Sequence, residues 1–241
     1  MKFKDKIYFC FTFIVLVMMS ILLIFYFGFI NPATERDRLF EEMREEYFTN
    51  KIATYEKENE VYGDYEVDVA FIGDSLTDMY DLKHYFPEIV TANRGISSDT
   101  TFGLEERLKV SLYDLKPKVV VMLIGGNNLN TMFDNYENIL ISLRDNLPDS
   151  KVVLMSLTAM SGSWGKNNNL AFKNNIKIKE LANKYNYYYV DLFSPLYDFV
   201  KQEAYADYTI DGAHFTPLGY EVVTGACKPV IYEALEEWKR G

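Results

Sequence analysis

Cysteine and histidine are scarce in this sequence, which contains two of each. Cys10 lies within an apolar segment and Cys227 lies near the C-terminus, so no disulfide is expected between them. His84 and His214 stand in different settings, and the acidic residues near His214 have no second histidine beside them. Because a metal centre needs several ligands close together, the sequence predicts no metal site, and no cofactor is expected.

Basic residues are also in deficit. The 25 lysines and arginines are outnumbered by 35 aspartates and glutamates, which gives a net charge of −10. Binding to a phosphate backbone requires concentrated Lys and Arg, so the sequence predicts no nucleic-acid partner. Hydrophobic residues make up 49% of the chain and charged residues 25%, which is typical of one globular domain with a small additional segment.

Charge is absent from residues 7–30. As a helix, this segment would span about 36 Å, which is enough to cross a hydrocarbon core of about 30 Å. Lys2, Lys4 and Lys6 precede it, and lysines of this kind favour the cytoplasmic side of a membrane. The sequence therefore predicts a short cytoplasmic tail (1–6), a transmembrane anchor (7–30) in the cell membrane, and an extracytoplasmic remainder.

Two other interpretations of this segment stay open. A cleaved signal peptide normally has an apolar region of about 7–15 residues that ends in small residues, whereas this one is longer and runs into Phe29 and Ile30. A buried hydrophobic helix is the other alternative. Residues 31–65 are rich in Glu and Arg, with apolar residues three or four apart and Pro32 suited to a first helical turn. They predict a charged juxtamembrane helix and linker, with a partner-binding helix as the alternative.

Residues 66–241 alternate between short apolar runs and helical patterns. Runs that are apolar at nearly every position are typical of strands buried on both faces of a parallel sheet. The pattern predicts an α/β fold, a doubly wound three-layer sandwich with a central parallel sheet. A Gly/Ser/Asn-rich stretch near 161–169 indicates a mobile loop. The predicted strands are 67–72, 119–124, 152–157 and 187–192, with a weaker one at 89–92, and the predicted helices are near 100–114, 134–147, 168–185 and 217–238.

Ligands of doubly wound sheets bind outside the carboxyl ends of the strands, so the residues after each strand are candidates for a site. Ser75 follows the first strand in the sequence Gly-Asp-Ser-Leu, where its hydroxyl would be exposed beside free backbone N–H groups. Gly95 follows the second strand, and Asn127 follows the third after two glycines. Each of these segments alone also fits an ordinary turn or helix cap.

The fourth candidate segment lies before the C-terminal helix. Asp211 precedes His214 by three residues, so its carboxylate can hold the imidazole in one tautomer and stabilise its cation. His84 has no such setting and is expected at the surface. The sequence lacks Gly-x-Ser-x-Gly, which argues against an ordinary α/β-hydrolase.

In this order the four segments resemble the blocks of the SGNH (GDSL-type) hydrolase superfamily, over about residues 66–238. They look most like its platelet-activating-factor acetylhydrolase-like branch, although many relatives have Asp where this chain has Asn128. The resemblance implies a flavodoxin-like fold and a carboxylic ester hydrolase. Its implied catalytic residues are Ser75, Asp211 and His214, with an oxyanion hole of Ser75, Gly95 and Asn127.

The expected reaction is hydrolysis of short-chain acyl esters, acetyl above all, through an acyl-enzyme on Ser75. The expected partners are a small ester substrate, such as an O-acetylated glycan, and the membrane through residues 7–30. Trp164 and the tyrosines near 185–189 are candidates for sugar stacking, with packing as the alternative. A lysophospholipase or thioesterase, an acyltransferase, and an inactive glycan-binding module remain alternative functions.

Overall fold

The structure is a computed structural model that describes the backbone of residues 3–240. It describes their side chains except at 1–3, 5–7, 9–10 and 29–34, so the prediction about Cys10 concerns a side chain outside the described residues. Met1 and Lys2 of the predicted cytoplasmic tail also lie outside them. The chain forms two compact units, residues 1–50 and residues 51–241, and each is described by itself.

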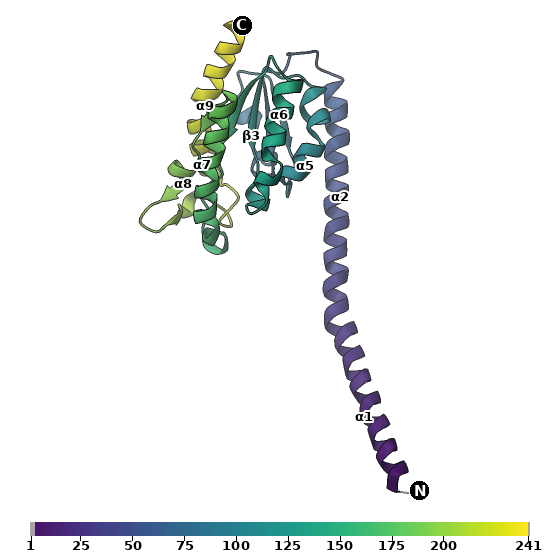
Figure 1. Cartoon of the computed structure of the whole chain (residues 1–241). Helices are drawn as coiled ribbons and strands as arrows, with labels where there is room; N and C mark the ends of the chain where they lie inside the picture. The colour runs from purple at the N-terminus through teal and green to yellow at the C-terminus, as the bar shows by residue number, and fades with distance from the viewer. Residues whose placement is uncertain (1–2, 241) are drawn as a thin grey trace. The chain divides into compact units, whose positions relative to one another are not determined.

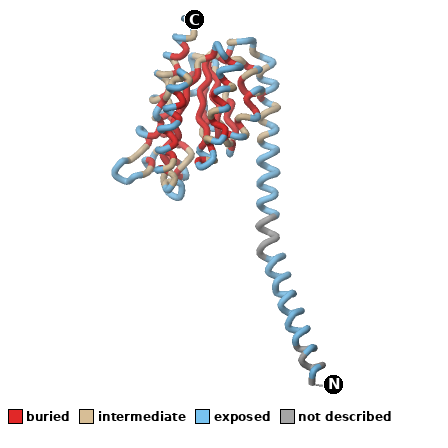
Figure 2. Tube along the Cα trace, viewed as in Figure 1, coloured by how far each residue is buried: buried red, intermediate tan, exposed pale blue. Residues whose placement is uncertain are grey.

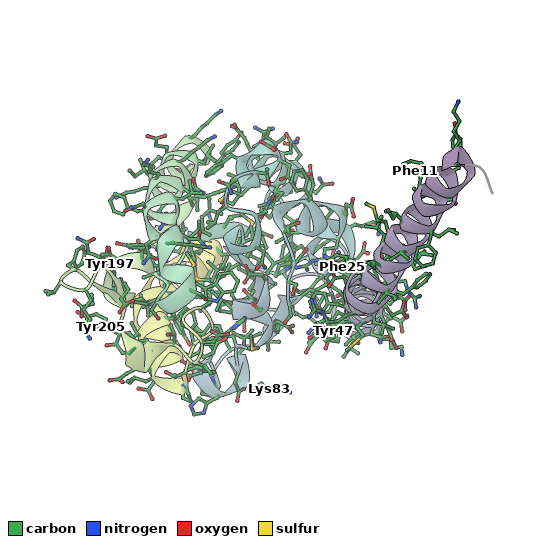
Figure 3. All side chains as sticks on the ribbon, turned by 90° about the horizontal axis from the view of Figure 1, so that it is seen from below. Phe11, Phe25, Tyr47, Lys83, Tyr197 and Tyr205 are labelled. Carbon is green, nitrogen blue, oxygen red and sulfur yellow. The ribbon has the colours of Figure 1, made fainter. Side chains whose placement is uncertain are left out.

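The first unit is helical throughout its described part. Helix α1 (Phe3–Phe25) is followed by a π-helical turn, η1 (Tyr26–Ile30), and by the start of α2 (Asn31–Asn59). Within the first unit, the segment Phe11–Gly28 has a mean hydropathy of 2.5, and the side chains of this segment are exposed (Figure 2). Phe11 and Phe25 project outward from the helix axis in Figure 3. This helix is long and apolar enough to cross a membrane, although a signal sequence meets the same criteria.

Helix α2 has the charged surface that its sequence predicts. Arg38 pairs with Glu35 at 2.7 Å and with Glu42 at 2.6 Å, one turn away in each direction. These pairs are exposed, so each contributes little to stability. The second compact unit begins at Lys51, within α2, which is earlier along the chain than residue 66, the predicted start of the hydrolase domain.

The second unit is built on a five-stranded sheet in which every neighbouring pair is parallel. The strand order is β2-β1-β3-β4-β5, the order of a doubly wound, flavodoxin-like sheet, which confirms the predicted fold (Figure 1). In register, Gly73 lies opposite both Gly95 and Leu123, so three strands end at one level. The strands are β1 (Val69–Gly73), β2 (Thr91–Gly95), β3 (Val119–Leu123), β4 (Lys151–Met155) and β5 (Tyr188–Val190).

Helices cover both faces of this sheet. On one face α9 (Pro217–Arg240) packs along β3, β4 and β5, and its Tyr220 stacks on Tyr80, which follows α3. On the other face α5 contacts α6, and both lie beside β3 in Figure 1. The remaining elements are α3 (Ser75–Asp78), α4 (Leu82–Tyr85), α5 (Thr101–Glu106), η2 (Lys109–Tyr113), η3 (Gly126–Asn128), η4 (Met132–Asp134), α6 (Tyr136–Asn146), η5 (Gly162–Asn167), α7 (Asn168–Tyr185), α8 (Phe193–Leu196), the β6–β7 hairpin (Tyr197–Asp198 with Glu203–Ala204) and η6 (Ala206–Tyr208).

The core lies in the strands, where every residue of β1 and β3 is buried (Figure 2). Two local predictions need correction. The helix predicted over 100–114 is α5 followed by the π-helical turn η2. The stretch predicted as a loop at 161–169 forms the 3₁₀ helix η5 and the start of α7, because the buried Asn168 side chain bonds both the N–H and the carbonyl of Met160 at 2.9 and 2.8 Å.

Two glycines allow the chain to pack closely at the end of β1 and β2. A Cβ on Gly73 would lie 2.1 Å from the carbonyl oxygen of Leu123. A Cβ on Gly95 would lie 2.2 Å from the backbone nitrogen of Asp78, in helix α3. Both contacts are with backbone, which cannot rotate away, so neither position has room for a side chain.

We therefore expect Gly95→Ala to destabilise the protein by about 1–3 kcal/mol, because α3 must move to admit a methyl group. Thermal unfolding followed by circular dichroism in detergent would measure the change. Gly225→Ala is the control, since Gly225 is exposed within α9 and its Cβ would meet nothing within 4 Å. That variant should gain about 0.5–1 kcal/mol from the better helix former. Equal stability of both variants would contradict the packing explanation.

Candidate active site

Ser75 is the first residue of α3, directly after β1. Asp74 caps this helix, since its carboxylate accepts the Leu76 N–H at 3.1 Å. The Ser75 N–H has no acceptor within its own helix, because the first N–H groups of any helix are unpaired there. The cap thus leaves a half-buried hydroxyl and a free backbone donor side by side at the carboxyl edge of the sheet.

His214 comes from the turn between η6 and α9, far along the chain, and its ring meets Ser75. The Ser75 Oγ and the His214 Nε2 are 3.0 Å apart, within hydrogen-bond distance. On its other side the His214 Nδ1 lies 2.7 Å from an oxygen of Asp211. The structure thus brings together the three predicted catalytic residues in the order hydroxyl, imidazole, carboxylate.

Asp211 is held in place by its own turn. Its second carboxylate oxygen accepts the backbone N–H groups of His214 at 2.9 Å and Ala213 at 3.0 Å. The His214 N–H, together with the contact to the His214 ring, lowers the pKa of Asp211 to about 2. Asp211 is therefore ionised near neutral pH, and a carboxylate at this position favours the tautomer that carries the proton of the His214 ring on Nδ1.

The Asp211–His214 turn is fixed against a second loop. The carbonyl of Gly212 accepts the Ser161 N–H at 2.8 Å. Gly212 has φ +93°, and a Cβ there would lie 2.3 Å from the carbonyl oxygen of Ser161. Only glycine fits both the left-handed backbone and the close approach. The position of the histidine thus depends on Ser161, which directly precedes η5, the 3₁₀ helix that carries Trp164.

A cavity of about 80 Å³ opens beside the Ser75 hydroxyl. Its apolar side chains include Leu123, Leu157 and Met160, which are buried and close the inner wall. Trp164 lines the cavity and is 44% exposed, so part of its indole faces solvent. The site is a small apolar pocket with the serine and histidine on one side. The other lining residues are Asp74, Leu76, Gly126, Asn127, Leu129, Thr158 and Ala213.

Asn127 lies in η3, after β3, and its side chain lines the same cavity. One of its two amide N–H bonds goes to the carbonyl of Asp99 at 2.8 Å. That bond fixes the orientation of the amide and leaves its second N–H for another acceptor. Asn127 therefore lines the same cavity as Ser75 and His214. Asn128 instead bonds Thr101 at the start of α5, at 2.9 Å.

Gly95 does not fit its predicted role in the oxyanion hole. It is the last residue of β2 rather than part of a loop, and its N–H donates to the Asn93 Oδ1 at 2.9 Å. This N–H is therefore already paired, and the glycine is explained by its close contact with α3. An oxyanion hole at this site would need a hydrogen-bond donor other than the Gly95 N–H.

The segment after Gly95 contains residues that the sequence interpretation missed. Ser98 is exposed, has φ +66°, and directly precedes Asp99, whose carbonyl binds Asn127. Among the described residues, no acceptor is seen for its N–H. Left-handed backbone is usually signalled by glycine, and serine gives no such signal.

Arg107, within the helix predicted near 100–114, was not among the candidate residues either. It is buried and pairs with Asp99 at 2.8 Å. Its other N–H groups bind the carbonyls of Arg94 at 2.8 Å and Gly73 at 3.0 Å. Arg107 thus connects the ends of β1 and β2 with the segment that reaches Asn127.

His84 is exposed in α4, as expected of a surface residue, and Cys227 is a buried free thiol in α9. Neither lines the cavity beside Ser75. Of the predicted sugar-stacking residues, Trp164 alone lines this cavity. Tyr185, Tyr187 and Tyr188 instead line a separate groove where β5 begins.

Residues 71–222 match the model of the GDSL-like lipase/acylhydrolase family. The chain belongs to this family. Its membership places the chain in the SGNH hydrolase superfamily, as the sequence blocks predicted. The match runs from β1 into α9 and includes Ser75, Asn127 and the Asp211–His214 turn.

Individual relatives agree with this assignment. The human platelet-activating factor acetylhydrolase IB subunit alpha2 is 30% identical over 127 residues, which are 49% of this chain and 54% of that protein. The chain thus spans about half the length of the curated relatives that it matches. Its sequence similarity to them supports the predicted acetylhydrolase-like branch.

Solved structures share the fold. A Streptococcus pneumoniae protein described provisionally as a platelet activating factor has 25% identity and a TM-score of 0.75, covering 83% of this chain and 99% of its own. A GDSL-like lipase from Bacteroides thetaiotaomicron has 24% identity and a TM-score of 0.66, with coverages of 78% and 99%. An acetylxylan esterase from Geobacillus stearothermophilus has 18% identity and a TM-score of 0.57, with coverages of 70% and 95%.

In this esterase the buried Asp74 makes stability depend on pH. Burial raises its pKa to about 7 from an ordinary 3.8; the bond from the Leu76 N–H opposes this shift and the nearby Asp99 adds to it. Between about pH 4 and pH 7 the folded state keeps a proton that the unfolded chain has released, so this group makes stability fall as pH rises.

We expect Asp74→Asn to flatten this part of the stability curve, since an amide keeps the helix cap without ionising. The variant should be more stable than the parent at pH 8 and should approach it at pH 4. Urea unfolding at pH 4, 6 and 8 would measure the difference. Asp207→Asn, which removes an exposed carboxylate, is the control. Parallel curves for the parent and Asp74→Asn would contradict the assignment.

Proposed function

We propose that this protein is a serine esterase that removes short acyl groups, acetyl above all, from carbohydrate, through an acyl-enzyme on Ser75. The observation that carries the proposal is the pair of contacts at His214. Its Nε2 is 3.0 Å from the Ser75 hydroxyl and its Nδ1 is 2.7 Å from Asp211. This is the arrangement that general-base activation of a serine requires.

In the proposed reaction the Ser75 Oγ attacks the ester carbonyl while His214 takes the hydroxyl proton. Asp211 holds the ring and stabilises the imidazolium that forms. The tetrahedral intermediate collapses as His214 gives the proton to the departing alkoxide, which leaves an acyl group on Ser75. Water, activated by the same histidine, then releases the carboxylic acid.

Negative charge on the carbonyl oxygen needs hydrogen-bond donors. We assign this role to the Ser75 N–H and the second amide N–H of Asn127, as predicted, and to the Ser98 N–H in place of Gly95. Ser98 supports the assignment through its position, since it is one residue from the carbonyl that orients Asn127. The Arg107–Asp99 pair would hold this segment in place.

The size of the cavity supports a short acyl group. Its volume is about 80 Å³, whereas a dry engineered cavity of about 150 Å³ accommodates benzene. Buried Leu123, Leu157 and Met160 block a longer chain from extending inward. A curated relative that is named an acetylhydrolase is in agreement, although it matches over only half its length.

Trp164 supports a carbohydrate on the alcohol side of the ester. Its indole lines the cavity yet stays 44% exposed, and an exposed aromatic face of this kind can pack on the C–H groups of a sugar ring. A fold neighbour is named an acetylxylan esterase, but at 18% identity it shares the fold alone.

We further propose that residues 7–30 anchor the esterase in the cell membrane, with residues 51–241 outside the cytoplasm. The apolar span Phe11–Gly28 supports this location. The same span favours a second candidate function, a lysophospholipase or thioesterase, because it would bring the enzyme close to lipid. The intact Ser75–His214–Asp211 contacts argue against an inactive glycan-binding module.

We expect the full-length protein in detergent to hydrolyse p-nitrophenyl acetate faster than the butyrate, with little activity on the octanoate. Ser75→Ala should reduce hydrolysis to background while leaving the fold intact, because among the described residues the Ser75 hydroxyl is the one that lies within hydrogen-bond distance of the His214 Nε2. A preference for the octanoate would support the lipid hydrolase instead. Unchanged hydrolysis by folded Ser75→Ala would end the proposal.

We expect Asn127→Ala to lower kcat about a hundredfold or more, because losing one oxyanion donor typically costs that much. KM should change little, since the bond strengthens mainly in the transition state. Asn130→Ala, at an exposed asparagine three residues away, is the control and should retain kcat. Steady-state kinetics with p-nitrophenyl acetate would compare them, and similar kcat values for both variants would remove Asn127 from the mechanism.

A further inference from the structure

The last turns of α2 belong to the same compact unit as the active site. Tyr55, in this part of the helix, is 1% exposed and is among the largest buried side chains. Its hydroxyl donates to the carbonyl oxygen of Gly95 at 2.6 Å. Residues 51–59 precede the region that matches the family model, which starts at residue 71.

A second contact links α2 to the same strand. Arg94 is fully buried in β2, and its guanidinium lies over the ring of Tyr55 at 4.6 Å from the centroid. The guanidinium also binds Glu58 and Asn59 of α2. A buried charge is tolerated only when it is paired, so these bonds fix α2 to the end of β2. The Arg94 carbonyl in turn accepts a bond from Arg107.

A third contact reaches the helix that begins with Ser75. Asp78, at the end of α3, accepts the Lys51 ammonium at 2.8 Å on one carboxylate oxygen. Its other oxygen accepts both the N–H of Ser97 at 3.0 Å and the Ser97 hydroxyl at 2.7 Å. Asp78 therefore ties three segments together: α2, the serine helix, and the strand-to-helix segment that contains Ser98.

We propose that Lys51 and Tyr55 are positioning residues for catalysis, which hold the serine helix and the Gly95–Asp99 segment in register from outside the family-matched region. This proposal rests on the proposed function, because it assigns the oxyanion donors to that segment. Neither residue lines the cavity beside Ser75. Their effect passes through Asp78 and the Gly95 carbonyl to Ser75, Ser98 and Asn127.

The contacts of Tyr55 and Lys51 determine how substitutions at these residues should affect catalysis. Tyr55→Phe keeps the buried ring under Arg94 but leaves the Gly95 carbonyl without its hydroxyl donor. Lys51→Met keeps the side-chain stem and removes the cation from Asp78. Small shifts of an oxyanion donor weaken transition-state binding more than substrate binding, so kcat should fall while KM changes little.

The experiment compares these variants with matched controls in the full-length protein in detergent. Tyr187→Phe is the control for Tyr55→Phe. Tyr187 directly precedes β5, and its hydroxyl donates to the backbone carbonyl of Leu140, so this variant also removes a tyrosine bond to a backbone carbonyl. Lys57→Met is the control for Lys51→Met, since Lys57 is an exposed lysine on the same part of α2. Each variant is assayed for its melting temperature, for kcat and KM on p-nitrophenyl acetate, and for the rate of labelling by a fluorophosphonate.

We expect Tyr55→Phe to lower kcat and the labelling rate about fivefold to tenfold, and Lys51→Met to lower them by a smaller factor, with KM little changed. Both controls should keep the parental rates, even if Tyr187→Phe melts as early as Tyr55→Phe. If Tyr55→Phe melts early but keeps its rates, the contacts are only structural and the proposal is overturned.

Ester hydrolysis and fluorophosphonate labelling together distinguish a failure of this proposal from a failure of the proposed function. A parent protein that is labelled at Ser75 but does not hydrolyse acetyl esters would overturn the proposed substrate, and the labelling rates would still judge the roles of Lys51 and Tyr55. A parent that neither hydrolyses esters nor is labelled would overturn both.

Discussion

A single buried ion pair connects the parts of this active site. The Arg107 guanidinium binds the Asp99 carboxylate, and its remaining N–H groups reach the Gly73 and Arg94 carbonyls and the Ser111 hydroxyl. Both charged side chains are almost completely buried, so neither can be removed without leaving unpaired polar groups in a medium of low dielectric constant. The pair thus links strands β1 and β2, which already pair with each other, to the segment that reaches Asn127.

Much of the fold follows from apolar periodicity. The strands predicted at 67–72, 119–124, 152–157 and 187–192 contain β3 and β5 in full, all of β1 except its last residue, and all of β4 except its first. β1 and β3 are buried at every residue and β4 at all but its first, which is why their sequences are apolar at nearly every position, whereas β5 is half-buried at its two tyrosines. The Asp211–His214 turn was also predictable, because the carboxylate and the imidazole are three residues apart in sequence and their contact is local.

Strand β2 shows where this reasoning stops. A strand was predicted at 89–92, but the observed strand is Thr91–Gly95 and includes Asn93 and Arg94. Polar residues ordinarily mark a strand's end, yet Arg94 is buried because α2 supplies partners from more than thirty residues earlier. Gly95 was therefore placed after the strand and expected in the oxyanion hole. Long-range pairing of buried polar groups leaves no periodic trace in the sequence, which is also why Arg107 was missed.

The same network explains why residues outside the family-matched region belong to the working enzyme. Strand β2 lies at the edge of the sheet. Without α2, its unpaired backbone groups and the side chain of Arg94 would be exposed to solvent. The end of α2 supplies an aromatic ring, a carboxylate and an amide to Arg94, and a cation to Asp78. The esterase unit is therefore the set of residues that complete these pairs, and it begins within α2.

The hydrogen bond between Ser161 and Gly212 also limits how the specificity of this esterase can change. Trp164, at the mouth of the cavity, is three residues from Ser161, and Gly212 is two residues from His214. Trp164, which we propose meets the alcohol part of a substrate, and His214, which we propose is the general base, are therefore linked through this one hydrogen bond. An insertion in this loop that widened the mouth would also displace the histidine.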